Sequence, residues 1–176
     1  MFKTMSTLII GIILSTTLIT TAAPAAGAKR SLLGSYKSWD AMVSGSGKNK
    51  ECYMISTPRK STASRKGATR GDIYTTVTHR PSFGIKNEVN AIVGYPLRAN
   101  SEVSVTMDGK SKYKLFTEGR GAWAYSPKDD AKMIASMKRG STMRVSGTSG
   151  RGTRTTDTYS LSGFTAAYNA ISKACR

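Results

Sequence analysis

The chain has 176 residues, and its 27 lysines and arginines outnumber its 10 acidic residues to give a formal net charge of +17 at pH 7. Such a charge attracts polyanions and anionic membrane faces and carries no information about the fold. His79 is the only histidine, so we expect neither a histidine-based triad nor a multi-histidine metal site, and no metal or cofactor.

The N-terminus has the organisation of a secretory signal peptide. Lys3 supplies a positive charge, residues 8–19 form an apolar run diluted by Gly and Thr, and residues 22–28 supply small residues in the A-x-A pattern. A retained membrane anchor is the alternative, but the apolar run is short for a span. We therefore expect residues 1–28 to be a signal peptide that is cleaved near Ala28.

The remaining chain, residues 29–176, is expected to be a single β-sandwich domain, because 148 of the 176 residues are enough for one domain with its own core. Cleavage removes one lysine and no acid, so the formal charge falls from +17 to +16. No second apolar stretch is long enough to predict a transmembrane segment. We expect a periplasmic, outer-membrane-associated or secreted protein, which excludes cytoplasmic nucleic acid as a partner.

Two cysteines, Cys52 and Cys175, lie near the two ends of this domain. In an oxidising compartment they favour one disulfide, which contributes about 4–5 kcal/mol in the chain-entropy model. Free thiols and a metal-binding pair are the alternatives. Two cysteines and one distant histidine do not complete a tetrahedral zinc site, so we predict the disulfide.

Strands are predicted along most of the domain, in chain order. Residues 29–37 are interpreted as a basic lead-in, and residues 58–70 as an exposed loop, because that segment holds five cations, no acid and no apolar periodicity. Short runs that are alternating, β-branched or aromatic predict strands, and Asp108-Gly109 predicts a hairpin turn. The predicted strands cover residues 39–43, 51–55, 73–78, 88–93, 102–107, 112–116, 122–125, 142–147 and 155–161.

Two helices complete the predicted fold. One begins at Asp129 and Asp130 and is stopped by Gly140, and the other runs from about Gly163 to Ala174. Strands that follow one another at hairpin distance favour an antiparallel sandwich over a parallel sheet. The fold class is therefore mainly β, an antiparallel sandwich with two short helices, the second of which is C-terminal and fixed by the disulfide.

Basic side chains are the best candidates for a binding function. Arginine beside backbone amides of Gly-rich turns suits sulfate, phosphate and carboxylate. The alternative is a solvated charge excess that keeps an exported protein soluble. The candidate anion-binding residues are Arg59, Lys60, Arg65, Lys66 and Arg70 in the first segment, and Arg144, Arg151 and Arg154 around residues 148–152.

Catalytic and adhesive motifs are weak by comparison. Asp129 and Asp130 fit a helix start, and Asp157 fits a buried, hydrogen-bonded carboxylate. No phosphate loop, nucleophile elbow or zinc motif occurs, so we predict that the protein is not an enzyme, and a hydrolase with a scattered site is the least favoured hypothesis. Residues 70–72 spell the tripeptide that integrins recognise on a displayed loop, but three residues recur by chance.

From Ile92 onward the sequence resembles the invasion-associated locus B family. The similarity lies in residues 94–97, 101–105, 122–124 and above all 147–167, with Cys175 closing the chain. Sparser N-terminal landmarks that match are Trp39, Cys52, Pro58 and the Arg80-Pro81 pair.

The resemblance implies an exported alphaproteobacterial protein with an immunoglobulin-like β-sandwich, whose family namesake is linked to erythrocyte invasion and so to virulence. It supplies no agreed catalytic residues. We expect a non-catalytic binding or host-interaction factor whose partner is an anionic polysaccharide, lipopolysaccharide or the host-cell surface. A structural or stress-related envelope protein with incidental charge is the alternative.

Overall fold

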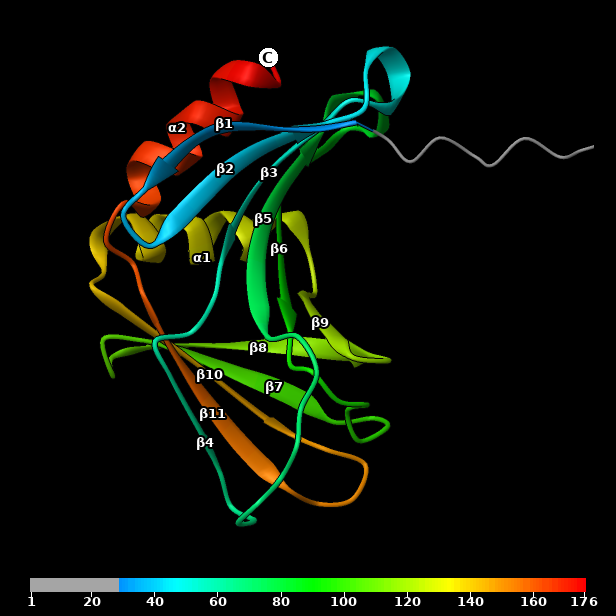
Figure 1. The fold of residues 1–176 in the computed structure, drawn as a ribbon, viewed down its shortest axis with the longest axis vertical. Helices are drawn as coiled ribbons and strands as arrows, with labels where there is room; N and C mark the ends of the chain where they lie inside the picture. Colours follow the sequence, from blue (N-terminus) through cyan, green and yellow to red (C-terminus); the bar gives the residue numbers. More distant parts are fainter. Residues whose placement is uncertain (1–28) are drawn as a thin grey trace, which may run out of the picture.

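The computed structural model describes residues 29–176, and the predicted signal peptide and its cleavage site near Ala28 lie outside the described residues (Figure 1). The strands of the described part form one antiparallel sheet of eleven strands in the order β1-β2-β3-β5-β6-β9-β8-β7-β10-β11-β4. Two helices pack on the same face of this sheet, which we call the inner face, and the opposite face is called the outer face.

The sheet has two parts that are useful to name separately (Figure 1). The upper half contains β1 (Arg30–Tyr36), β2 (Trp39–Ser44), β3 (Glu51–Ser56), β5 (Tyr74–Arg80) and β6 (Ile85–Ile92). The lower half contains β9 (Gly121–Ala124), β8 (Ser111–Glu118), β7 (Glu102–Met107), β10 (Thr142–Thr148), β11 (Arg154–Ser160) and β4 (Lys60–Ala63).

Alternating sequences form the strands because one face of each strand is buried. In β7, Val103, Val105 and Met107 are buried, and the residues between them point to the outer face. Val105 pairs in register with Val145 of β10, so the apolar residues of neighbouring strands meet on the inner face. This pattern predicts the strands of the core from sequence.

Helix α1 (Pro127–Arg139) begins two residues before the predicted start. The hydroxyl oxygen of Ser126 accepts a hydrogen bond from the backbone N–H of Asp129 at 3.2 Å, which caps the helix. The helix packs on β6 of the upper half, and the hydroxyl of Tyr113 in β8 lies 2.6 Å from that of Ser136. Helix α1 therefore contacts both halves of the sheet.

Helix α2 (Phe164–Ala174) covers β1, β2 and β3 of the upper half. Phe164 meets the ring of Trp39 edge-on, with 4.9 Å between the ring centroids, and the indole N–H of Trp39 donates to the carbonyl of Ser160 at 3.0 Å. The Cys52–Cys175 disulfide joins β3 to the end of α2. The predicted disulfide and its link to the C-terminal helix are confirmed.

The mainly β, antiparallel fold with two helices is confirmed, and its strands lie in a single continuous sheet that runs through β6, β9 and β8. Two segment predictions were wrong. The supposed lead-in forms β1, and the supposed loop at residues 58–70 contains β4, which pairs with β11. Every residue of β4 is exposed, so this edge strand has no apolar alternation to reveal it. Among the described residues, no helix has the length and apolar character needed to cross a membrane.

Candidate functional site

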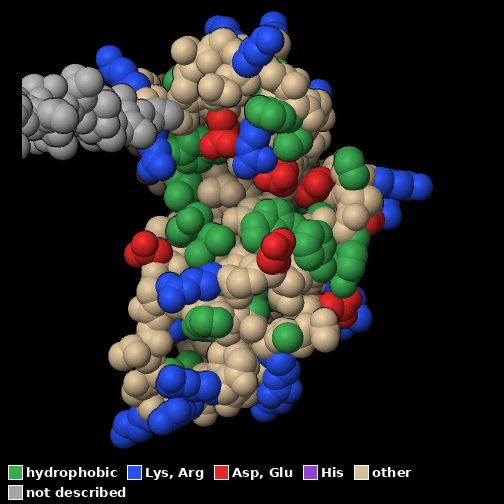
Figure 2. All heavy atoms as spheres, turned by 90° about the vertical axis from the view of Figure 1, so that its right-hand side faces the viewer, with side chains coloured by type: hydrophobic (Ala, Val, Ile, Leu, Met, Phe, Trp, Pro, Cys, Tyr) green, Lys and Arg blue, Asp and Glu red, His purple; other side chains and the backbone are tan. Residues whose placement is uncertain are grey.

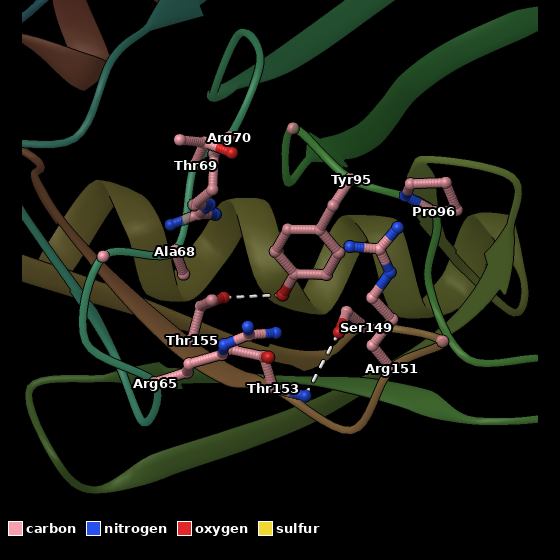
Figure 3. Close-up of a pocket in the computed structure, with 13 residues that line it drawn as sticks. Arg65, Ala68, Thr69, Arg70, Tyr95, Pro96, Ser149, Arg151, Thr153 and Thr155 are labelled. Carbon is pink, nitrogen blue, oxygen red and sulfur yellow. Dashed lines mark hydrogen bonds between the residues drawn. The ribbon is translucent and has the colours of Figure 1, made fainter.

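A cavity of about 480 Å³ lies at the free end of the lower half, where the loops that follow β4, β6 and β10 meet (Figure 3). We call it the cationic cavity, because three arginines line it. Its lining residues are Arg65, Gly67, Ala68, Thr69, Arg70, Gly94, Tyr95, Pro96, Ser149, Gly150, Arg151, Thr153 and Thr155.

Gly94 allows the loop after β6 to approach the loop after β4. The N–H of Gly71 donates to the carbonyl of Gly94 at 2.8 Å, and Gly94 has a positive φ of 78°. A Cβ on Gly94 would overlap the backbone of Gly71, so any other residue would push the two loops apart. This contact holds Arg70 and Tyr95 next to each other.

One side of the cavity is formed by Arg70, which makes a buried ion pair with Asp157 of β11. Two parallel hydrogen bonds join them, Nη1 to Oδ1 at 2.7 Å and Nη2 to Oδ2 at 2.6 Å. The two side chains are only 9% and 1% exposed. Burial alone would lower the pKa of the Arg70 guanidinium, but the hydrogen bonds and charge of Asp157 outweigh burial and raise it. Arg70 and Asp157 therefore neutralise each other.

Arg70 also donates through Nε and Nη2 to the carbonyl of Val93, at 2.9 and 2.6 Å. The Arg70 guanidinium is therefore occupied by contacts within the protein. The prediction that Arg70 binds an anion needs correction. The same contacts turn Arg70 of the integrin-type tripeptide inward, whereas Asp72 is exposed. Asp157 has the buried, hydrogen-bonded role predicted from sequence.

Tyr95 forms one wall of the cavity. Its hydroxyl oxygen lies 2.6 Å from that of Thr155, and the Arg70 guanidinium carbon lies 5.2 Å from its ring centroid (Figure 3). Burial raises the pKa of Tyr95, so the hydroxyl stays neutral at physiological pH. Tyr95 therefore shapes the cavity without adding charge.

Arg65 and Arg151 are the cations available to a ligand. They come from different loops, and both are exposed (Figure 3). Among the described residues that line the cavity there is no carboxylate, and the Asp157 charge beneath it is matched by Arg70. The cavity consequently presents a net positive charge to a ligand.

The Gly-rich turn at residues 148–152 shapes the cavity but offers few free backbone N–H donors to a ligand. The N–H of Gly150 donates to the carbonyl of Pro96 at 3.1 Å, and that of Gly152 donates to the carbonyl of Ser149 at 2.8 Å. The expected pairing of arginine with these backbone amides is therefore not available, because the amides bond within the protein. Anion recognition here would rest on the guanidinium groups.

Sequence reasoning missed three residues of this region: Tyr95, Thr155 and Arg98. Arg98 lies beside the turn, since its Nη2 would be 3.3 Å from a Cβ on Gly152. Neutral Tyr95 and Thr155 offered no charge signal, and Arg98 lies outside the two basic clusters in the sequence. Only their positions in the fold reveal their relation to the cavity.

The other predicted cations lie elsewhere on the molecule. Lys60 and Arg144 project from the outer face, where each pairs in register with Thr158 of β11 from opposite sides. Arg59 donates to the hydroxyl of Ser38 at 3.0 Å. Lys66 and Arg154 are exposed near the cavity and do not line it. The eight predicted residues are thus divided between the cavity and other surfaces.

His79 is buried near the end of β5 in the upper half. Its Nε2 lies 3.1 Å from the hydroxyl of Ser172, and its Nδ1 accepts from the N–H of Asn87 at 3.1 Å. Burial lowers its pKa. Within residues 29–176, no cluster of three His, Cys, Asp or Glu side chains is arranged to hold a metal ion.

Comparisons with known proteins identify the family. The model of the invasion associated locus B (IalB) protein family matches residues 39–172, which span β2 to α2 and include the cavity loops. Searches among curated proteins and among solved structures give no match. Since the family model covers most of the chain, this protein belongs to the invasion-associated locus B family.

Proposed function

We propose that this protein is an exported, non-catalytic binding protein whose cationic cavity takes an anionic group. The group is a sulfate, phosphate or carboxylate of a polysaccharide, of lipopolysaccharide or of a host-cell surface. The observation that carries the proposal is that Arg65 and Arg151 reach the same cavity from two different loops. Their charges are not neutralised by a carboxylate in the described lining.

The size and chemistry of the cavity suit a group on a larger molecule. Its volume of about 480 Å³ lies within the ~300–1,000 Å³ range of ligand sites, so it holds more than one small anion. A planar guanidinium binds an oxyanion through two parallel N–H donors, which favours sulfate, phosphate and carboxylate over halide. Two such groups from separate loops favour a ligand with more than one anionic oxygen.

The lining also supports binding over catalysis. Among its described residues there is no carboxylate, imidazole or thiol, and the raised pKa of Tyr95 keeps its hydroxyl protonated at neutral pH. Export is supported by the family, by the disulfide and by the sequence of residues 1–28. Together these observations favour a binding factor outside the cytoplasm.

The test compares two variants of equal net charge. The cavity variant carries Arg65→Gln and Arg151→Gln, and the control carries Lys60→Gln and Arg144→Gln on the outer face. Each mature protein is eluted from immobilised heparin and from immobilised lipopolysaccharide with a salt gradient. We expect the cavity variant to elute at a clearly lower salt concentration than the control, because only the cavity variant loses the two guanidinium groups that reach the cavity.

Circular dichroism spectra and thermal unfolding confirm that both variants keep the fold. If the two variants shift equally, the retention reflects net charge alone and the proposed site is wrong. Weak retention of the parent protein would favour the alternative, a structural or stress-related envelope protein with incidental charge.

A further inference from the structure

A cluster of aromatic side chains lies on the outer face, at the junction between the two halves of the sheet. Phe116 and Trp123 stack with 5.9 Å between centroids and 25° between planes, and Tyr125 lies 5.6 Å from Phe116. Phe116 is 36% exposed and Tyr125 is 58% exposed. We call these three residues the aromatic platform. Figure 2 shows that hydrophobic and acidic side chains gather at mid-height on one side of the molecule, with Lys and Arg side chains above and below them.

The sheet holds the first two rings nearly parallel. Phe116 of β8 and Trp123 of β9 are directly paired in register, so their side chains emerge side by side. The indole of Trp123 lies over Gly121, where a Cβ would overlap the ring. The missing side chain lets the indole lie along its strand. The result is a solvent-exposed apolar surface, in which the ring of Tyr125 is tilted by 56° from that of Phe116.

Carboxylates border the aromatic platform on two sides. Glu102 pairs in register with Phe116, accepts a hydrogen bond from the Tyr125 hydroxyl at 3.0 Å, and forms an ion pair with Lys114 at 2.6 Å. On the other side, a depression of about 350 Å³ is lined by Phe116, Trp123 and Tyr125 together with Lys86, Glu88 and Asp130. Glu88 forms an ion pair with Arg80 at 3.1 Å. Acidic groups are scarce in this basic protein, and here they flank exposed rings.

We propose that the aromatic platform is a second binding site, for a neutral or amino-sugar-containing glycan. Sugar rings pack their C–H faces against aromatic rings, and their hydroxyl and amide N–H groups need acceptors such as Glu88 and Glu102 at the rim. The ion pairs of Glu88 with Arg80 and of Glu102 with Lys114 leave the rim with little net charge, so it lacks the excess of cations that attracts polyanions to the cationic cavity. The platform is therefore selective for a different class of ligand, and this inference does not depend on the cavity.

The extent of the platform also favours a glycan over a protein partner. A stable protein interface covers about 800 Å² on each partner, with roughly 20–30 residues a side. Three rings with carboxylates on both sides match one or two sugar units instead. Charge and size thus point to the same occupant.

The test titrates the mature protein with chitotetraose and with cellotetraose, followed by tryptophan fluorescence and by calorimetry. Trp39 is only 1% exposed, so a fluorescence change reports on Trp123. We expect saturable binding of at least one glycan that is insensitive to salt. Phe116→Ala with Tyr125→Ala should weaken it at least tenfold, while Leu32→Ala, which shortens a 58% exposed side chain on β1, should leave it unchanged.

Saturable binding of neither glycan overturns the proposal, as does equal affinity in the double variant and the parent. A protein partner crosslinked at Tyr125 in the absence of glycan binding also overturns it. If the double variant loses its fold, Tyr125→Ala alone is used, because this exposed ring contributes little to the core. Two further measurements distinguish this proposal from the proposed function of the cavity. The platform variants should keep the heparin retention of the parent protein, and the cavity variant should keep its glycan binding.

Discussion

The upper half and the cavity end of the lower half are stabilised by different kinds of interaction. In the upper half, α2 packs Phe164 on Trp39 and the disulfide joins α2 to β3. At the cavity end of the lower half, an ion pair and a Tyr–Thr hydrogen bond occupy the interior. Apolar packing and the disulfide stabilise the fold of the upper half but do not specify a ligand. The buried ion pair costs desolvation free energy, and it fixes the positions of the two side chains that it joins.

This contrast explains where the binding surfaces lie. Arg70 and Asp157 position the loops around the cavity, and the aromatic platform lies where the two halves join. The upper half carries most of the helix packing and can serve as the rigid support. Three sets of variants test this division of roles, from the largest expected effect to the smallest.

The disulfide should make the largest contribution to global stability. The two cysteines are 123 residues apart in sequence, so replacing both with Ala is expected to lower the free energy of unfolding by about 4–5 kcal/mol. Urea denaturation followed by tryptophan fluorescence measures this loss. Reduction of the parent protein with dithiothreitol is the matched control, and a loss below about 1 kcal/mol in both would show that the crosslink is not a main support.

The buried ion pair should matter nearly as much. Asp157→Asn leaves the Arg70 guanidinium buried without its counter-charge, which is expected to cost about 3–5 kcal/mol. Arg70→Met combined with Asp157→Leu removes both charges and should recover much of this loss in stability. It should not restore heparin binding, because the loops lose their alignment. If Asp157→Asn is as stable as the parent protein, the structural role of the ion pair is contradicted.

Asp130 should have the smallest effect on the free energy of unfolding, and this effect should depend on pH. Burial raises its pKa from 3.8 to about 6, although the N–H of Val89 donates to its Oδ1 at 2.9 Å. The folded state binds the proton more tightly than the unfolded state, so the stability from this group falls as pH rises from about 4 to about 6. The dipole of helix α1, whose first turn contains Asp130, favours the ionised carboxylate and offsets part of the cost of burying its charge.

Asp130→Asn keeps the acceptor and removes the charge. We expect this variant to be more stable than the parent by about 1–2 kcal/mol at pH 7.5 and to match it near pH 4. Thermal unfolding across this pH range measures the difference. A constant offset at all pH values would mean that packing, and not ionisation, is responsible.

The sequence predicts the parts of the fold where local pattern and burial agree. Alternation in β7 and the cap and charge pattern of α1 are local signals, and the two cysteines leave one pairing. Strands β1 and β4 were missed because both are edge strands with mostly exposed residues, so neither shows the period of a buried face.

The cationic cavity was only partly predictable for a different reason. Arg65 and Arg151 were predicted as anion-binding residues from local charge, but Arg70 was not distinguishable from them. Its partner Asp157 is 87 residues away, and that pairing depends on where β11 lies in the sheet. Burial of one arginine and exposure of the others are consequences of long-range packing, which no local composition encodes.

The most direct test of the cavity is an NMR titration of the ¹⁵N-labelled mature protein with a defined heparin hexasaccharide. We predict that amide shift changes concentrate at residues 65–70, 94–96 and 149–155, and that Arg65→Gln with Arg151→Gln abolishes them. Shift changes centred on Lys60 and Arg144 of the outer face, or spread evenly over the basic surface, would contradict the assignment of anion binding to this cavity.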